Sequence, residues 1–241
     1  MARRRPRILV LQHMSVCHPG IFRELLRADS TPWDAVALDA GEPIPDLAGY
    51  DGLLVMGGAM DVWQEAEHPW LRAEKAAIRE AVLARGMPYL GICLGHQLLA
   101  DALGGEVRLA PAPEIGVFEV ALNDAGRRHP LFAGLPAQGR FLQWHAAEVV
   151  RPPAGAAVLA ASASCAVQAL ACGERAFGLQ FHAEVDAPTL AEWLADPVAQ
   201  EALVLRLGAD GPARFTDEVQ AHMAHLNEMA RRLYNNFSAL L

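Results

Sequence analysis

One cysteine stands between two glycines, at a point where an apolar run gives way to a helical pattern. The segment G-I-C-L-G-H-Q runs from Gly91 to Gln97, with Cys93 at its centre. A nucleophile held at such a turn adopts an unusual backbone conformation, and small neighbours leave room for it. The N-terminus of the following helix favours a thiolate, which is the reactive form of cysteine. Because buried structural cysteines are also common, this motif alone does not identify a nucleophile.

A histidine and a glutamate two residues apart follow a late apolar run. They are His182 and Glu184, at the end of the segment G-L-Q-F-H-A-E that begins at Gly178. Residues two apart on a strand lie on the same side, so we expect Glu184 to orient the imidazole of His182. His182 would then take the thiol proton of Cys93 and return it to a leaving amine, as in a catalytic triad. A surface H-x-E pair at the end of a strand is the alternative interpretation.

Paired glycines supply a third motif, V-M-G-G-A-M, from Val55 to Met60. At the carboxyl end of a parallel strand, Gly57 and Gly58 allow a backbone N–H to approach a ligand closely. We expect the N–H groups of Gly58 and Leu94 to stabilise an oxyanion. An ordinary Gly-Gly turn is the alternative. The three motifs all follow strands, and their combination is typical of an active site in a doubly wound sheet.

The elements that must position these residues alternate between apolar strands and helices. Four strands are expected, at residues 7–11, 33–38, 51–56 and 87–92. Helices are expected at 21–27, between Pro69 and Gly86, and at 94–105. Strands that are apolar throughout and separated by helices predict an α/β fold, with a mostly parallel central sheet flanked by helices.

The chain changes character twice after this region. From Glu106 to Val185, strand-like runs separated by turns predict a mixed or antiparallel extension that later rejoins the main sheet. After Pro188 the chain is expected to be helical to its end. We therefore predict a first domain at residues 1–190 and a helical C-terminal extension at 191–241.

The last predicted helix carries an apolar stripe. Its members alternate four and three residues apart and are Val219, Met223, Leu226, Ala230, Leu233 and Phe237. Thr216 is expected to cap this helix, with acidic residues in the first turn. The stripe must be buried, either on the chain's own domain or, given its heptad-like spacing, in a homodimer.

Composition excludes several classes of partner. The chain of 241 residues has a formal net charge of −8, which disfavours binding to nucleic acid. The basic run M-A-R-R-R-P-R precedes an apolar run that stops at Gln12, too short for a signal peptide or a membrane span, so a cytoplasmic protein is expected.

Four cysteines in a chain with an ample core predict no disulfide. Because His13, Cys17 and His18 lack regular ligand spacing, we expect no metal site there.

Taken together, the three motifs resemble those of the class I (triad) glutamine amidotransferases, and especially the stand-alone proteins similar to the glutaminase domain of GMP synthase. The resemblance covers about residues 7–190 and implies a flavodoxin-like fold without a cofactor. It implies that Cys93 attacks the side-chain amide of glutamine, releases ammonia and forms a thioester that water hydrolyses. It also implies that substrate contacts come from Gly57, Gln97, Gly116 and Val117, and that Trp144 and His145 form a pair typical of this subgroup.

The sequence departs from the family pattern in ways that leave its function open. Ala183 stands where the family often has proline, and Ala146 and Ala147 follow His145 where Gly-Asp is usual. We find no P-loop or S-G-G-x-D motif, so the chain is not expected to be a complete synthetase. Four functions are considered: a self-sufficient γ-glutamyl hydrolase, a glutaminase subunit that feeds a separate synthase, a cysteine-elbow hydrolase of another branch, and a non-catalytic regulatory relative. The complete Cys, His and Glu set argues against the last.

Overall fold

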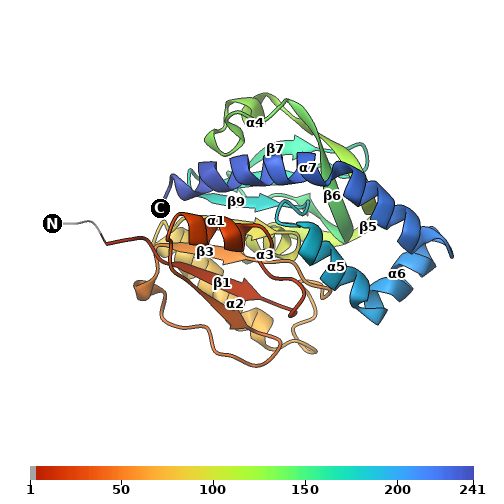
Figure 1. Ribbon diagram of the computed structural model, residues 1–241. Helices are drawn as coiled ribbons and strands as arrows, with labels where there is room; N and C mark the ends of the chain where they lie inside the picture. The colour runs from red at the N-terminus through yellow and green to blue at the C-terminus, as the bar shows by residue number, and fades with distance from the viewer. Residues whose placement is uncertain (1–3) are drawn as a thin grey trace.

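A nine-stranded sheet forms the centre of the computed structural model, which describes residues 4–241; Met1 to Arg3 of the basic N-terminal run lie outside the described residues. Its strands are β1 (Ile8–Gln12), β2 (Trp33–Ala37), β3 (Gly52–Val55), β4 (Tyr89–Ile92), β5 (Glu106–Leu122), β6 (Gln138–Arg151), β7 (Ala157–Ala161), β8 (Ala169–Cys172) and β9 (Ala176–Leu179). Their order in the sheet is β2-β1-β3-β4-β9-β8-β7-β5-β6 (Figure 1). The first five in this order run parallel, and the remaining pairings are antiparallel. The predicted α/β fold is therefore confirmed, and β9 is the strand by which the antiparallel part rejoins the parallel one.

Helices cover both faces of this sheet, which is why its central strands are apolar on both sides. The helices are α1 (Phe22–Ala28), α2 (Trp70–Arg79), α3 (Leu94–Ala102), α4 (Asp124–Arg128), α5 (Ala187–Ala195), α6 (Pro197–Leu207) and α7 (Gly211–Ser238). Short 3₁₀ turns occur at Leu47–Gly49 and Pro130–Phe132, and α2 continues as a π-helical turn over Glu80–Ala84.

Alternate residues of β1 show how the two faces are filled. Ile8 and Val10 pack into the core shared with α1 and α7, whereas Leu9 and Leu11 pack into the core shared with α2 and α3. All four side chains are buried, as expected when successive side chains of a strand point to opposite faces. No helix within residues 4–241 combines the length and the apolar character that crossing a bilayer requires.

The long helix α7 runs across the sheet beside α1 (Figure 1). The C-terminal part of α7 packs into the core that β1 shares with α1. Five members of the predicted stripe are buried, and the sixth, Met223, is partly buried against the same chain. The stripe thus packs on its own domain, the first of the two arrangements expected. Residue 190, the predicted end of the first domain, lies inside α5. Helix α7, in the predicted C-terminal extension, shares a hydrophobic core with the sheet.

The predicted start of α7 is wrong. The helix begins at Gly211, with Pro212 in its first turn, rather than after Thr216. The Thr216 hydroxyl donates a hydrogen bond to the Pro212 carbonyl, 2.7 Å away, in the pattern of a threonine inside a helix. A proline is well suited to the first turn of a helix because its missing N–H would have no partner there.

Candidate active site

Cys93 occupies a strained turn between β4 and α3. Its φ of 51° and ψ of −102° place a non-glycine residue in a region that L-amino acids rarely adopt. The two flanking glycines make the turn sterically feasible. A Cβ on Gly91 would lie 2.4 Å from the Gly95 backbone, and one on Gly95 would lie 2.2 Å from the Val55 carbonyl oxygen. The segment therefore has the geometry of a nucleophile elbow.

His182 reaches Cys93 because β9 pairs directly with β4, so the chain leaving β9 passes the elbow. The Nδ1–H of His182 donates to the Glu184 Oε1, 2.8 Å away. Both side chains are buried. The expectation that they share one side of a strand is wrong, since β9 ends at Leu179 and His182 makes only an isolated bridge to Leu142. A hydrogen bond in an irregular segment, rather than strand periodicity, brings the two together.

The charges around His182 favour its protonated form. Burial lowers the pKa of His182, but the negative charges of Glu184 and Cys93, together with hydrogen bonds to both, raise it to about 10. The Gln180 amide also directs an N–H at the Cys93 sulfur, 3.6 Å away. Two hydrogen-bond donors, the His182 ring and the Gln180 amide, therefore lie beside the Cys93 sulfur.

The other three cysteines lie in environments of the opposite kind. Burial raises the pKa of Cys17 well above its ordinary value, that of Cys165 to about 12 and that of Cys172 to about 11. All three therefore remain neutral thiols near pH 7, and Cys93 is the cysteine that lies beside the His182–Glu184 pair.

Two backbone amides near Cys93 are free to bind an anion. Within residues 4–241, neither the Gly58 N–H nor the Leu94 N–H has a hydrogen-bond acceptor. Leu94 begins α3, where the N–H groups of the first turn carry the positive end of the helix dipole. The Gly95 N–H donates a hydrogen bond to the Met56 carbonyl, 3.1 Å away. This bond connects the start of the helix to the segment Val55–Met60, called the glycine loop below. These are the two donors expected from the sequence.

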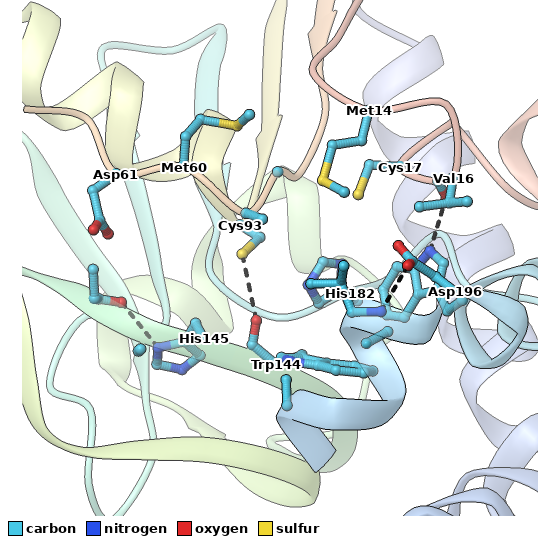
Figure 2. Close-up of a pocket in the computed structure, with 18 of the residues that line it drawn as sticks. Met14, Val16, Cys17, Met60, Asp61, Cys93, Trp144, His145, His182 and Asp196 are labelled. Carbon is cyan, nitrogen blue, oxygen red and sulfur yellow. Dashed lines mark hydrogen bonds between the residues drawn. The ribbon is translucent and has the colours of Figure 1, made fainter. Parts of the chain in front are cut away.

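A cavity of about 270 Å³ opens at the Cys93 sulfur. Figure 2 shows Met60, Asp61 and His145 on one side of Cys93, and Met14, Cys17 and His182 on the other. Gln97, Ala146 and Ala147 also line the cavity. The side beside His182 is mainly apolar.

That apolar side is built largely from the C-terminal helices. The Trp193 ring of α5 lies 4.8 Å from the His182 ring, and its Nε1–H donates to the Val16 carbonyl, 2.8 Å away. Asp196, between α5 and α6, and Val198 of α6 also line the cavity. No sequence motif marked these residues, because an apolar helix position that faces a cavity has the same pattern as one that faces the core.

The four residues expected to contact substrate differ in position. Gln97 lines the cavity, and its side-chain amide donates to the Ala147 carbonyl and to Gln180, at 2.9 and 3.1 Å. Gly57 lies against His182, since a Cβ there would be 3.1 Å from the His182 ring. Gly116 and Val117 are not among the residues that line the cavity. They lie on β5 near α7, where a Cβ on Gly116 would be 3.0 Å from the Glu218 carboxylate.

His145 belongs to a buried polar network rather than to a metal site. Polar atoms of Glu114, His145 and Cys165 lie within 4.8 Å of one another. The Glu114 carboxylate already accepts hydrogen bonds from His145, Ser162, Ser164 and Gln168. Four donors satisfy a buried carboxylate without a metal ion. His13 and His18, weighed earlier as ligands, have separate carboxylate partners, Glu74 and Glu192.

Comparison with known proteins agrees with this geometry. Residues 22–198 match the family described as glutamine amidotransferase class-I. The chain is 37% identical to a glutamine-hydrolysing GMP synthase subunit of Sulfolobus acidocaldarius, over 63% of this chain and 77% of that protein. It is 41% identical to GMP synthase of Aeropyrum pernix over 69% of its own length, but spans only 28% of that longer protein.

Solved structures extend the similarity over nearly the whole chain. A glutamine amidotransferase from Thermotoga maritima is 27% identical and superposes with a TM-score of 0.87, covering 98% of this chain and 99% of that one. A glutamine amidotransferase from Methylobacillus flagellatus is 28% identical, with a TM-score of 0.80. The family match covers most of the chain, which is therefore a member of the class-I glutamine amidotransferase family.

Proposed function

We propose that this protein hydrolyses the γ-glutamyl amide of glutamine through a thioester on Cys93. The observation that carries the proposal is His182, 2.8 Å from the Glu184 carboxylate, beside a cysteine at a nucleophile elbow. The two free amides of Gly58 and Leu94 support it, because acyl transfer develops a negative oxygen that needs such donors.

Each residue then has a defined role. The Cys93 thiolate attacks the amide carbon, and the carbonyl oxygen becomes an oxyanion facing the N–H groups of Gly58 and Leu94. The C–N bond breaks as His182 gives its proton to the departing nitrogen, which leaves as ammonia. His182, now neutral, takes a proton from water, whose oxygen attacks the thioester. The C–S bond breaks, glutamate leaves, and Cys93 and His182 return to their starting forms.

The polar side of the cavity suits the amino-acid end of the substrate. Asp61 can pair with the α-ammonium group, while backbone groups of Ala146 and Ala147 and the Gln97 side chain offer hydrogen bonds. The departing nitrogen must then lie on the other side, next to His182, because a general acid acts within hydrogen-bond distance of the proton acceptor.

Two destinations for that nitrogen are considered. Similarity to the glutamine-hydrolysing subunits of GMP synthases supports a glutaminase that passes ammonia to a separate synthase. The Trp193 ring beside His182 supports the second, a hydrolase of γ-glutamyl amides whose nitrogen carries an apolar group. Ammonia has no apolar surface to bury against this ring, whereas each methylene group that a larger leaving amine buries contributes about 0.8 kcal/mol to the binding free energy.

Rates on a series of substrates separate these functions. The purified protein is assayed for glutamate release from glutamine and from the γ-glutamyl ethyl, propyl and butyl amides, whose leaving amines have similar basicity. A self-sufficient hydrolase with an apolar subsite gives a kcat/KM that rises about fourfold per methylene. A synthase-dependent glutaminase prefers glutamine and is accelerated when its synthase partner is added. If Cys93 forms no acyl-enzyme with any member of the series, as judged by intact-protein mass spectrometry, the proposed chemistry is refuted.

A further inference from the structure

A buried histidine–glutamate pair outside the triad contacts the glycine loop. His13 follows the end of β1, Glu74 lies on α2, and neither side chain has exposed surface. The Nε2 atom of His13 is 2.8 Å from the Glu74 Oε1, and its Nδ1 atom is 2.9 Å from the Gly57 carbonyl oxygen. The ring also stacks on Trp70, with 5.4 Å between ring centroids. None of these three side chains takes part in the chemical steps above.

The direction of the hydrogen bond to Gly57 does not depend on the protonation state of the pair. A carbonyl oxygen can only accept, so the Nδ1 atom of His13 carries a hydrogen and donates it. Burial lowers the pKa of His13, but the charge of Glu74 and the hydrogen bonds to Glu74 and Gly57 outweigh it and raise the pKa. Glu74, on the Nε2 side, fixes the ring orientation from the opposite side.

Peptide geometry carries the effect of this bond to the neighbouring amide. In a trans peptide the C=O of one residue and the N–H of the next point in opposite directions. The described residues contain no cis peptide bond. With the Gly57 oxygen turned toward His13, the Gly58 N–H is turned away from His13. Gly58 lines the cavity, and its N–H has no acceptor within residues 4–241.

The glycine pair needs such an anchor. Two successive glycines have a large conformational freedom, so the peptide between them can rotate at low energetic cost. Larger residues are excluded at Gly58, where a Cβ would lie 2.9 Å from the His13 Cβ and 2.9 Å from the Leu94 side chain. Orientation of this peptide must therefore come from an external contact.

We propose that His13 and Glu74 are positioning residues that aim the Gly58 N–H at the oxyanion of the reaction. This inference rests on the proposed function, since it assigns the pair a role in the same acyl transfer. The alternative is that the pair only stabilises the fold.

The test removes the pair without leaving a buried charge. In the double variant His13→Phe/Glu74→Leu, an aromatic ring still stacks on Trp70 and both polar groups are replaced by apolar groups of similar size. Loss of one oxyanion donor lowers kcat by about 10²–10³-fold. A donor that is present but whose orientation is not fixed should lower kcat by about 10–100-fold. We expect that loss in kcat for glutamine with KM changed by less than about twofold, since the effect belongs to the transition state.

Two further measurements distinguish positioning from stability. A γ-glutamyl aldehyde, which forms a tetrahedral oxyanion adduct with Cys93, should lose affinity by the same factor as kcat. The variant Glu74→Gln should retain most of the activity, because its amide donates to the His13 Nε2 and leaves the Nδ1–H on Gly57. The matched control is His68→Phe, since the His68 ring lies 5.5 Å from the Trp70 ring, whereas the hydrogen bond to the Gly57 carbonyl comes from His13.

The outcomes are distinct. A folded double variant with wild-type kcat overturns the inference, as does a loss that appears equally in KM or an aldehyde affinity that stays constant. Equal losses in His68→Phe would assign the effect to packing around Trp70 and would also overturn it. If the wild-type protein neither releases glutamate nor is acylated at Cys93, the proposed function fails and the inference fails with it.

Discussion

Replacement of Glu184 by glutamine tests the charge state of His182 in the proposed triad. The substitution keeps a side chain of the same shape next to His182 but removes its negative charge. Glu184 approaches the His182 Nδ1 to 2.8 Å in a buried setting, and its charge is one of the factors that raise the pKa of His182 to about 10. In Glu184→Gln this attraction is lost, while the burial that lowers the pKa remains.

The size of the effect follows from the geometry. Two unit charges with centres ~4 Å apart, at an effective dielectric constant of about 20, attract by ~4 kcal/mol. One pKa unit corresponds to about 1.4 kcal/mol, so the pKa of His182 should fall by about 3 units. A folded-state pKa near 10 would become a pKa of about 7. At pH 8 about one tenth of the variant would then carry the proton that the leaving nitrogen needs.

The assay is the pH profile of kcat/KM for glutamine, whose high-pH limb reports the acid of the free enzyme. The limb should lie near pH 10 in the wild-type protein and about 3 units lower in Glu184→Gln, with similar rates at pH 6. Glu192→Gln is the matched control, because Glu192 pairs with His18 at 2.6 Å outside the triad. If the high-pH limb lies at the same pH in Glu184→Gln and in the wild-type protein, the claim that Glu184 keeps His182 protonated is refuted.

Three further predictions concern the nucleophile, the base and the last helix. Cys93→Ala should abolish glutamate release with an unchanged melting temperature, and a γ-glutamyl chloroketone should label Cys93 alone; labelling of Cys165 or Cys172 would contradict this. His182→Ala should lose more activity than Glu184→Gln at pH 6, measured as kcat, because it removes the base itself. Deletion of residues 211–241 exposes several buried side chains worth about 1.5–3 kcal/mol each, enough to unfold the domain, and a stable truncated monomer by calorimetry would refute that packing.

Much of the site could be predicted because its determinants are local. The elbow needs small residues at Gly91 and Gly95 since the backbone itself fills the space of their Cβ atoms. Such a requirement is visible in a short motif. His182 and Glu184 were also predicted, although the reason given was wrong, because the strand ends before them.

The remaining features depend on packing between distant segments. Trp193 reaches the cavity only because α5 lies against the segment around Val16, and nothing in its own helix indicates this. Gly116 and Val117 were assigned to the substrate by resemblance, whereas β5 carries them beside α7. The start of α7 was misplaced because a proline at the first turn, Pro212, determined it rather than the capping threonine.

The central place of β9 determines when the protein can become active during its synthesis. Leu90 of β4 pairs with Phe177 of β9, so the two sides of the site meet only after a loop of about 90 residues has closed. A nascent chain that has emerged as far as α3 contains Cys93 and its elbow but lacks the base that activates them. His182, the proposed base, therefore reaches Cys93 only after β9 has inserted into the sheet beside β4. The order of the strands thus delays reactivity until the fold is nearly finished.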